Sequence, residues 1–137
     1  MKLQLAALCE AANVSAEGKI NILGEFDTIN TPSTPTFWPL MVFVAKLKIG
    51  QTDIGEHSVS LRVLDEDMQL VADPVEGAVR IAELPASGIE TGWPLILRIG
   101  NAQFKTFGTY TFEFRVDGAT IVELPLHVQK IPAASHP

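Results

Sequence analysis

The sequence predicts an all-β protein, a two-sheet antiparallel β-sandwich of immunoglobulin-like or jelly-roll-like topology with about eight or nine strands. Segments in which apolar and polar residues alternate recur along the chain, and this is the pattern of half-buried strands. Clusters of Gly, Pro, Asn and Asp separate these segments at near-regular spacing. No segment has a convincing helical periodicity, so alternating strand and helix units are not expected.

The first expected element is a strand over Leu3–Leu8. The N-terminal run is similar to a secretion signal, but Gln4 interrupts it, and its apolar stretch is at the lower limit of the roughly 7 to 15 residues that a signal needs. Cys9 is the only cysteine, so no intrachain disulfide can form, and its apolar neighbours predict a buried thiol. A chain without disulfides suits a reducing compartment, and we expect a cytoplasmic protein.

Further strands are expected in the segments that lie between clusters of turn-forming residues. These strands are expected over residues 19–26, 37–49, 78–84 and 95–99. The linkers are expected at Glu17-Gly18, 31–36, 50–55, 85–88 and 100–101.

The strand that begins at Phe37 is unlike the others because almost every residue through Ala45 is apolar. One of its faces is expected in the sandwich core, and the other needs cover from a loop, the edge of the second sheet or another subunit. A subunit or partner interface on this strand would use Trp38, Leu40, Val42 and Val44.

Residues 55–71 predict a hairpin in which the acidic turn Asp65-Glu66-Asp67 leads into a return strand over Met68–Val71. The strand over 55–63 resembles the later segment 108–116, because each begins with Gly and carries an outward Arg just before its last Val.

The chain closes with a second hairpin. Apolar residues alternate with polar ones from Tyr110 to Val116 and again from Val122 to Val128. Asp117-Gly118 between them supplies the positive φ values of a type I′ turn. Tyr110 stands where sandwich domains place a tyrosine corner, whose hydroxyl bonds back to the chain.

Length and charge limit the organisation and the classes of partner. The 137 residues predict one domain over 1–131 with a C-terminal tail over 132–137. A formal charge of −6 disfavours nucleic acid as a partner. No apolar run approaches the roughly 20 residues that span a bilayer, so membrane insertion is not expected.

Two groups of residues are candidates for ligand binding. Asp65, Glu66 and Asp67 offer carboxylates for calcium at one end of the sandwich, although solvated acids are also usual at a hairpin tip. Trp38 and Trp93 each precede a proline and offer rings for stacking on a sugar, with plugging of the core ends as the structural alternative.

The sequence contains no familiar catalytic motif, and no cofactor is expected. An active site would require His57 or His127 to meet a carboxylate from Glu10, Glu25 or Asp27, and the distance along the chain neither supports nor forbids this. We therefore expect a protein that is not an enzyme.

Several motifs together resemble a family of small bacterial proteins of unknown function. They span nearly the whole chain: Leu8-Cys9-Glu10, the segment 18–27, Val44-Ala45-Lys46-Leu47, the segment 108–112, and Val116-Asp117-Gly118. The resemblance implies a bacterial cytoplasmic sandwich domain and brings no catalytic or binding residues with it.

The function that the sequence favours is a non-enzymatic module that binds a protein partner or copies of itself. The alternative is a ligand-binding sandwich that takes carbohydrate or calcium with loops at one end. The apolar strand from Phe37 to Ala45 favours the first hypothesis.

Overall fold

A computed structural model describes residues 1–84 and 89–132 and is all-β, as predicted. These residues contain nine strands and a short 3₁₀ helix at Gln51–Asp53. The strands are β1 (Lys2–Val14), β2 (Ile20–Glu25), β3 (Thr28–Thr31), β4 (Thr36–Ile49), β5 (Gly55–Leu64), β6 (Val75–Ile81), β7 (Thr91–Phe104), β8 (Gly108–Val116) and β9 (Ala119–Lys130).

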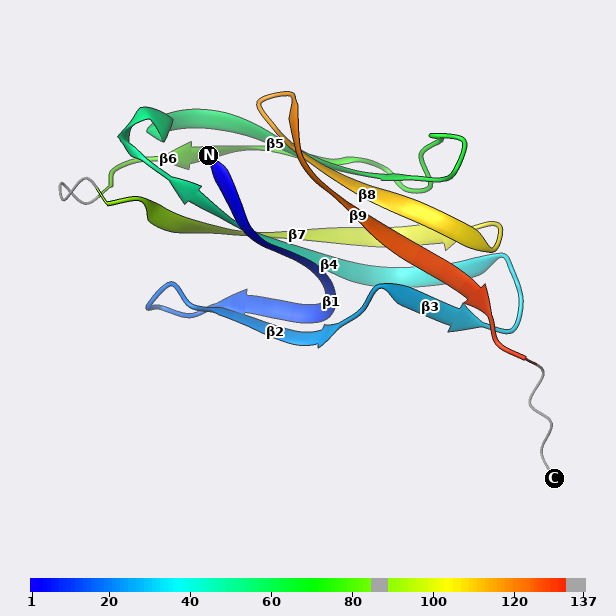
Figure 1. Cartoon of the computed structure of the whole chain (residues 1–137). Helices are drawn as coiled ribbons and strands as arrows, with labels where there is room; N and C mark the ends of the chain where they lie inside the picture. The colour runs from blue at the N-terminus through cyan, green and yellow to red at the C-terminus, as the bar shows by residue number, and fades with distance from the viewer. Residues whose placement is uncertain (85–88, 133–137) are drawn as a thin grey trace.

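The strands form two sheets that pack face to face as a sandwich (Figure 1). One sheet has the order β2-β1-β4-β7 and the other has the order β3-β9-β8-β5-β6. Neighbouring strands are antiparallel, except that β3 runs parallel to β9. Because β3 pairs with β9 while β2 pairs with β1, the short segment between β2 and β3 crosses from one sheet to the other.

One continuous apolar core fills the space between the sheets. Alternate residues of each strand face it. Phe43 of β4 meets Phe114 of β8 with ring centroids 5.2 Å apart, and this contact joins the middle of the two sheets. Near one end, Phe104 and Tyr110 meet edge to face at 4.8 Å. Both pairs have the tilted or edge geometry that aromatic rings prefer.

The closing hairpin has the predicted turn and the predicted tyrosine corner. Asp117 and Gly118 have φ values of 51° and 80°, as a type I′ turn requires. The buried hydroxyl of Tyr110 donates to the carbonyl oxygen of Thr106 at 2.7 Å. Beside the turn Val116 lies opposite Ala119, and the register of β8 and β9 shifts by one residue between Arg115 and Phe114.

The hairpin predicted over 55–71 is present at its tip but not along Met68–Val71. The N–H of Val71 donates to Val63 at 3.0 Å, which closes the tip. Met68 has a φ of 61°, outside the strand region, and the regular partner of β5 begins only at Val75. Pro74, immediately before Val75, lacks the N–H that would continue the ladder.

Other boundaries also differ from expectation. β1 and β7 are longer than predicted, β6 begins earlier, and β3 was not predicted. The expected linker 85–88 and residues 133–137 of the expected tail lie outside the described residues.

The hairpin made by the second half of β1 and by β2 folds beneath β4 and β7, on the side away from the five-stranded sheet (Figure 1). Ala12 and Ile20 of this hairpin pack against a small second cluster formed by Cys9, Val42 and Val44. The apolar outer face of β4 is thus covered over part of its length by the chain itself.

Candidate functional site

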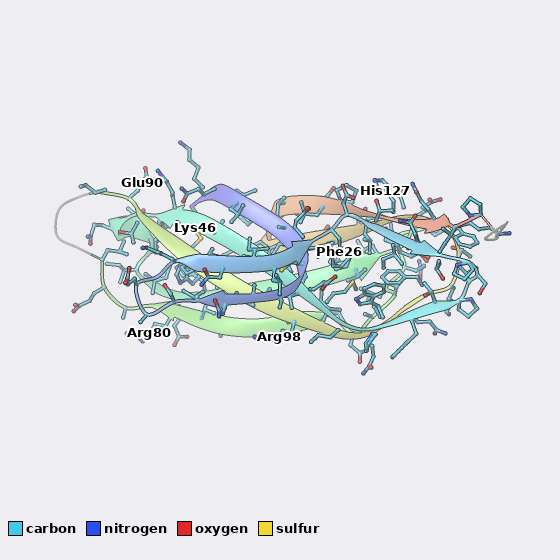
Figure 2. All side chains as sticks on the ribbon, turned by 90° about the horizontal axis from the view of Figure 1, so that it is seen from below. Phe26, Lys46, Arg80, Glu90, Arg98 and His127 are labelled. Atoms are coloured by element: carbon cyan, nitrogen blue, oxygen red, sulfur yellow. The ribbon has the colours of Figure 1, made fainter. Side chains whose placement is uncertain are left out.

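β2 is an edge strand, and no other strand of the residues described lies on its far side. In Figure 2, which views the molecule from below, β2 lies toward the viewer in front of the strands of the two sheets. Leu23 is 70% exposed and the neighbouring Ile22 is 36% exposed. Apolar side chains therefore stand at an open sheet edge, which we call the β2 edge and define as Lys19 to Glu25.

The backbone of the β2 edge offers hydrogen-bonding groups to solvent. At the turn of the hairpin the N–H of Ser15 donates to the carbonyl oxygen of Lys19 at 2.8 Å. The register is continuous from this pair along the strand to Ile20 and Ile22. Because hydrogen-bonded and non-hydrogen-bonded pairs alternate in an antiparallel ladder, the N–H and C=O groups of Ile20 and Ile22 point away from β1.

The exposed face of the hairpin has a shallow depression of about 340 Å³ lined by Ala11, Asn13, Asn21 and Leu23 among others. That volume lies within the range of ligand pockets. However, the amide of Asn21 donates to the side-chain oxygen of Asn13 at 2.8 Å, so the two polar side chains bond each other. The depression is better suited to apolar contact than to a polar ligand.

The residues predicted as an interface on β4 fall into three different environments. Val42 and Val44 are 3% and 0% exposed, because the β1–β2 hairpin covers them. Leu40 is exposed on the same outer face. Trp38 packs against the main core, because the inward face of β4 changes at Pro39, opposite the left-handed Asn101 of β7.

Of the three acidic residues considered for calcium, Asp65 and Glu66 bond to the chain with their carboxylates, and Asp67 takes part through its backbone. One carboxylate oxygen of Asp65 accepts from the N–H groups of Asp67 and Gln69, at 2.8 and 2.9 Å. Glu66 accepts from the N–H of Thr109 at 2.9 Å and thereby ties the tip to the start of β8. Glu66 lies so close to Gly108 that a Cβ atom added to Gly108 would be 2.6 Å from the Oε1 atom of Glu66.

The two tryptophans considered for sugar binding both pack against the main core. Trp38 meets Phe26 with ring centroids 5.8 Å apart. Trp93 meets the ring of His57 at 6.4 Å. Leu47 stands opposite Trp93 in the ladder. Trp38 lies nine residues earlier on β4, so the two indoles cover opposite ends of the core.

His57 joins three segments at the end of the sandwich that holds Trp93. Its Nδ1 atom lies 2.6 Å from a carboxylate oxygen of Asp117, and its Nε2 atom lies 2.6 Å from the carbonyl oxygen of Asp53. The bonds to Asp117 and then to Asp53 raise the pKa of His57, and the bond to His57, followed by that from the N–H of Ser58, lowers the pKa of Asp117. Neither ring nitrogen is left for a substrate or a metal.

The other groups considered for catalysis do not converge with His57. The Nδ1 atom of His127 lies 3.0 Å from the hydroxyl of Thr109, on the outside of the five-stranded sheet. Asp27 approaches His127 only through its backbone, since its carbonyl oxygen accepts from the N–H of His127 at 2.9 Å. Glu10 lies beside Gly24 and Glu25 lies opposite Cys9 in the β1–β2 hairpin. Among the residues described, no group of three or more His, Cys, Asp or Glu side chains is arranged to hold a metal.

Two further buried groups have structural partners. Glu113 is 7% exposed, and its Oε1 atom accepts two hydrogen bonds from Arg62, at 3.0 and 2.7 Å, while the Nε atom of Arg115 lies 3.8 Å from the same oxygen. The two arginines are the outward ones noted in the resemblance between segments 55–63 and 108–116. Cys9 is fully buried as predicted, burial raises the pKa of its thiol, and its Sγ atom contacts the carbonyl oxygen of Val42 at 3.7 Å.

The β2 edge is the candidate that the sequence did not single out. A signal was available, because Ile22 and Leu23 are consecutive apolar residues and alternation must expose one of them unless both faces are covered. What the sequence cannot show is that this strand takes an edge position.

Within residues 1–84 and 89–132, no helix is long and apolar enough to cross a membrane. A search of curated proteins finds none that matches the chain. A family model described as "Family of unknown function (DUF6941)" matches residues 4–129. All the motifs on which the resemblance to a family of unknown function was based fall inside this range. The chain therefore belongs to DUF6941, a family of unknown function.

Proposed function

We propose that this chain is a non-enzymatic protein-interaction module of the bacterial cytoplasm and that its binding surface is the β2 edge. A protein partner adds a strand to this edge, with backbone hydrogen bonds to Ile20 and Ile22 and apolar contact to Leu23. Support for the cytoplasmic setting comes from the single buried Cys9, which suits a fold without disulfides.

The observation that carries this proposal is the difference between β2 and the other three edges. Natural sheets protect their edges with Pro, charges, bulges or short strands. β7 contains Pro94 and the left-handed Asn101, and β6 carries Glu76 and Arg80. β3 is only four residues long. By contrast, β2 presents Ile-Asn-Ile-Leu without a charge, a proline or a left-handed residue until Gly24, whose φ is 69°, and Glu25 at the end of the strand.

A site-specific photo-crosslinker tests the proposal. With the crosslinking residue in place of Leu23, irradiation of cells that express the chain at native level should give one defined adduct. Met68, a 63% exposed apolar side chain on the Asp65–Gln69 turn, is the matched control position and should give none.

A second variant links the adduct to strand addition. Ile22→Pro removes an edge N–H but no hydrogen bond of the β1–β2 ladder, because that N–H points away from β1. The Leu23 adduct should disappear in the Ile22→Pro background while the circular dichroism spectrum is unchanged. An adduct that persists with Ile22→Pro, or equal adducts from positions 23 and 68, would overturn the proposal.

A further inference from the structure

We infer that the partner of the β2 edge is a second copy of this chain, paired antiparallel across a two-fold axis at Ile22. This inference rests on the proposed function and names its partner. It joins the four-stranded sheets of two copies into one continuous sheet and leaves neither β2 edge open.

The direction of the backbone groups permits this axis. A two-fold axis normal to an antiparallel sheet passes through the middle of a residue pair, and each residue of a hydrogen-bonded pair exchanges both bonds with the other. The N–H and C=O groups of Ile22 point outward, as derived from the Ser15–Lys19 turn bond. Ile22 of one copy can thus bond Ile22 of the second copy in both directions.

The charges of the β2 edge are arranged symmetrically about Ile22. Lys19 precedes it by three residues and Glu25 follows it by three. In a pairing centred on Ile22, Lys19 of each copy therefore comes to the end of the shared ladder at which Glu25 of the other lies, just beyond the left-handed Gly24, whose φ is 69°. Opposite charges at neighbouring positions of paired strands stabilise a sheet. The intrachain contact of Lys19, with Glu17 at 3.1 Å, is between side chains that are both 75% exposed, so it competes weakly.

The apolar residues fit the same register. Ile22 stands beside Ile22 of the second copy, and the regular ladder runs from Ile20 to Leu23, because Gly24 has a left-handed φ of 69°. On the other face Leu23 is opposite Asn21, and the two leucines are diagonal neighbours within reach of each other. A pairing centred on Leu23 would instead place Lys19 opposite Asp27, which lies beyond the end of β2 and whose carbonyl oxygen is bonded to His127 of the other sheet.

Sedimentation velocity of the full chain between roughly 1 and 500 µM should show a reversible monomer–dimer equilibrium, because so short an interface belongs to the weak, transient class. The dimer contains two contacts between Lys19 and Glu25. Each of the variants Lys19→Glu and Glu25→Lys brings like charges together at both contacts and should weaken dimerisation at least about fivefold. The double variant restores both pairs and should dimerise within about twofold of the wild type. Lys48→Glu on β4 and Glu123→Lys on β9 change the net charge equally away from the edge and should have no effect.

Mixing gives the sharpest test of the register. Lys19→Glu pairs favourably with Glu25→Lys and neither pairs well with itself, so an equimolar mixture should dimerise at least about tenfold more tightly than either variant alone. A wild-type chain that stays monomeric at all concentrations, or a dimer that these charges do not affect, would overturn the inference. If the chain is monomeric but the Leu23 crosslinker captures a different protein in an Ile22-dependent manner, the proposed function stands without this inference; if it captures nothing, both fail.

Discussion

At the scale of single residues, His57 has the most informative environment. Both atoms that face its ring nitrogens are acceptors, a carboxylate oxygen of Asp117 and the carbonyl oxygen of Asp53. A neutral imidazole donates from one nitrogen only, so its other nitrogen would direct a lone pair toward one of these acceptors. The imidazolium carries two N–H groups and donates to both. The charged form of His57 therefore fastens the start of β5 to the turn between β8 and β9.

This arrangement predicts a pH dependence of stability. The folded pKa of His57 is raised above the value of 6.5 for the free side chain. The stabilisation is thus fully present below about pH 6.5 and is lost as the pH rises through the folded pKa. The pKa of Asp117 is lowered in the folded protein, so its contribution to stability is lost at acidic pH, as the pH falls through that pKa. The midpoint of urea unfolding should decrease as the pH rises from about 6.5 through the folded pKa of His57.

Asp117→Asn is the matched variant for this prediction, because Asn also tolerates the positive φ of the type I′ turn. It removes the charge but keeps the turn. The pH-dependent decrease should become smaller, and the ring protons of His57, followed by NMR, should titrate at lower pH than in the wild type. A His57 ring that titrates at or below pH 6.5 in the wild type would contradict the prediction.

The tyrosine corner gives a second prediction at this scale. Tyr110→Phe removes the hydroxyl that donates to the carbonyl oxygen of Thr106 and should lower the free energy of unfolding by about 1 kcal/mol, measured with urea. Thr106→Val keeps that carbonyl and loses only a side-chain contact of 3.4 Å, so its change should stay within about 0.5 kcal/mol. Equal losses in the two variants would show that the backbone bond is not the cause.

At the scale of elements, the β1–β2 hairpin is held to the sandwich by a small apolar cluster separate from the main core. Val44→Ala removes two methyl groups from the centre of that cluster and should lower the free energy of unfolding by about 2 kcal/mol. Hydrogen exchange should accelerate first at the amides of the hairpin, such as that of Ser15, and less in β8.

Leu40→Ala is the control for this prediction, because Leu40 lies on the same outer face of β4 but is 47% exposed. Its effect on stability should be within about 0.5 kcal/mol and should not change hairpin exchange. Uniform acceleration of exchange across both sheets in Val44→Ala would mean that the hairpin is part of the main cooperative unit.

Local patterns predicted the elements whose structure depends on near neighbours. The Asp117-Gly118 turn, the corner at Tyr110 and the buried Cys9 follow from residues within a few positions. β3 could not be predicted in this way, because Thr28–Thr31 has little apolar character and becomes a strand only through parallel pairing with β9, about a hundred residues later in the chain.

The candidate site shows the same limit. The sequence indicated correctly that β4 carries apolar residues on both faces, but the segment that covers Val42 and Val44 is the β1–β2 hairpin, which is remote from β4 in the sequence. Open apolar side chains therefore lie on β2 as well as on the first residues of β4, where Phe37 and Leu40 stay exposed. Trp38 faces the core because the inward face of β4 changes at Pro39, opposite the left-handed Asn101 of β7. The contact between these two strands is not visible in the sequence.

At the scale of the whole molecule, a single core connects the two ends of the sandwich. Trp38 packs at one end against Phe26, and Trp93 packs at the other beside His57. Trp38 is on β4, and Trp93 lies opposite Leu47, nine residues further along the same strand. Nine residues of a strand span about 30 Å. A core of this kind should unfold as one cooperative unit.

Two single-tryptophan variants test this cooperativity. Trp93→Phe leaves Trp38 as the fluorescent reporter, and Trp38→Phe leaves Trp93. Each variant has its own stability, so the comparison is made within a variant, between the urea midpoint of fluorescence and that of far-ultraviolet circular dichroism. The two midpoints should coincide in both variants, because strand pairing and packing at either end are lost together. If the midpoints separate in one variant only, the end that keeps its tryptophan unfolds independently, and the core is not one unit.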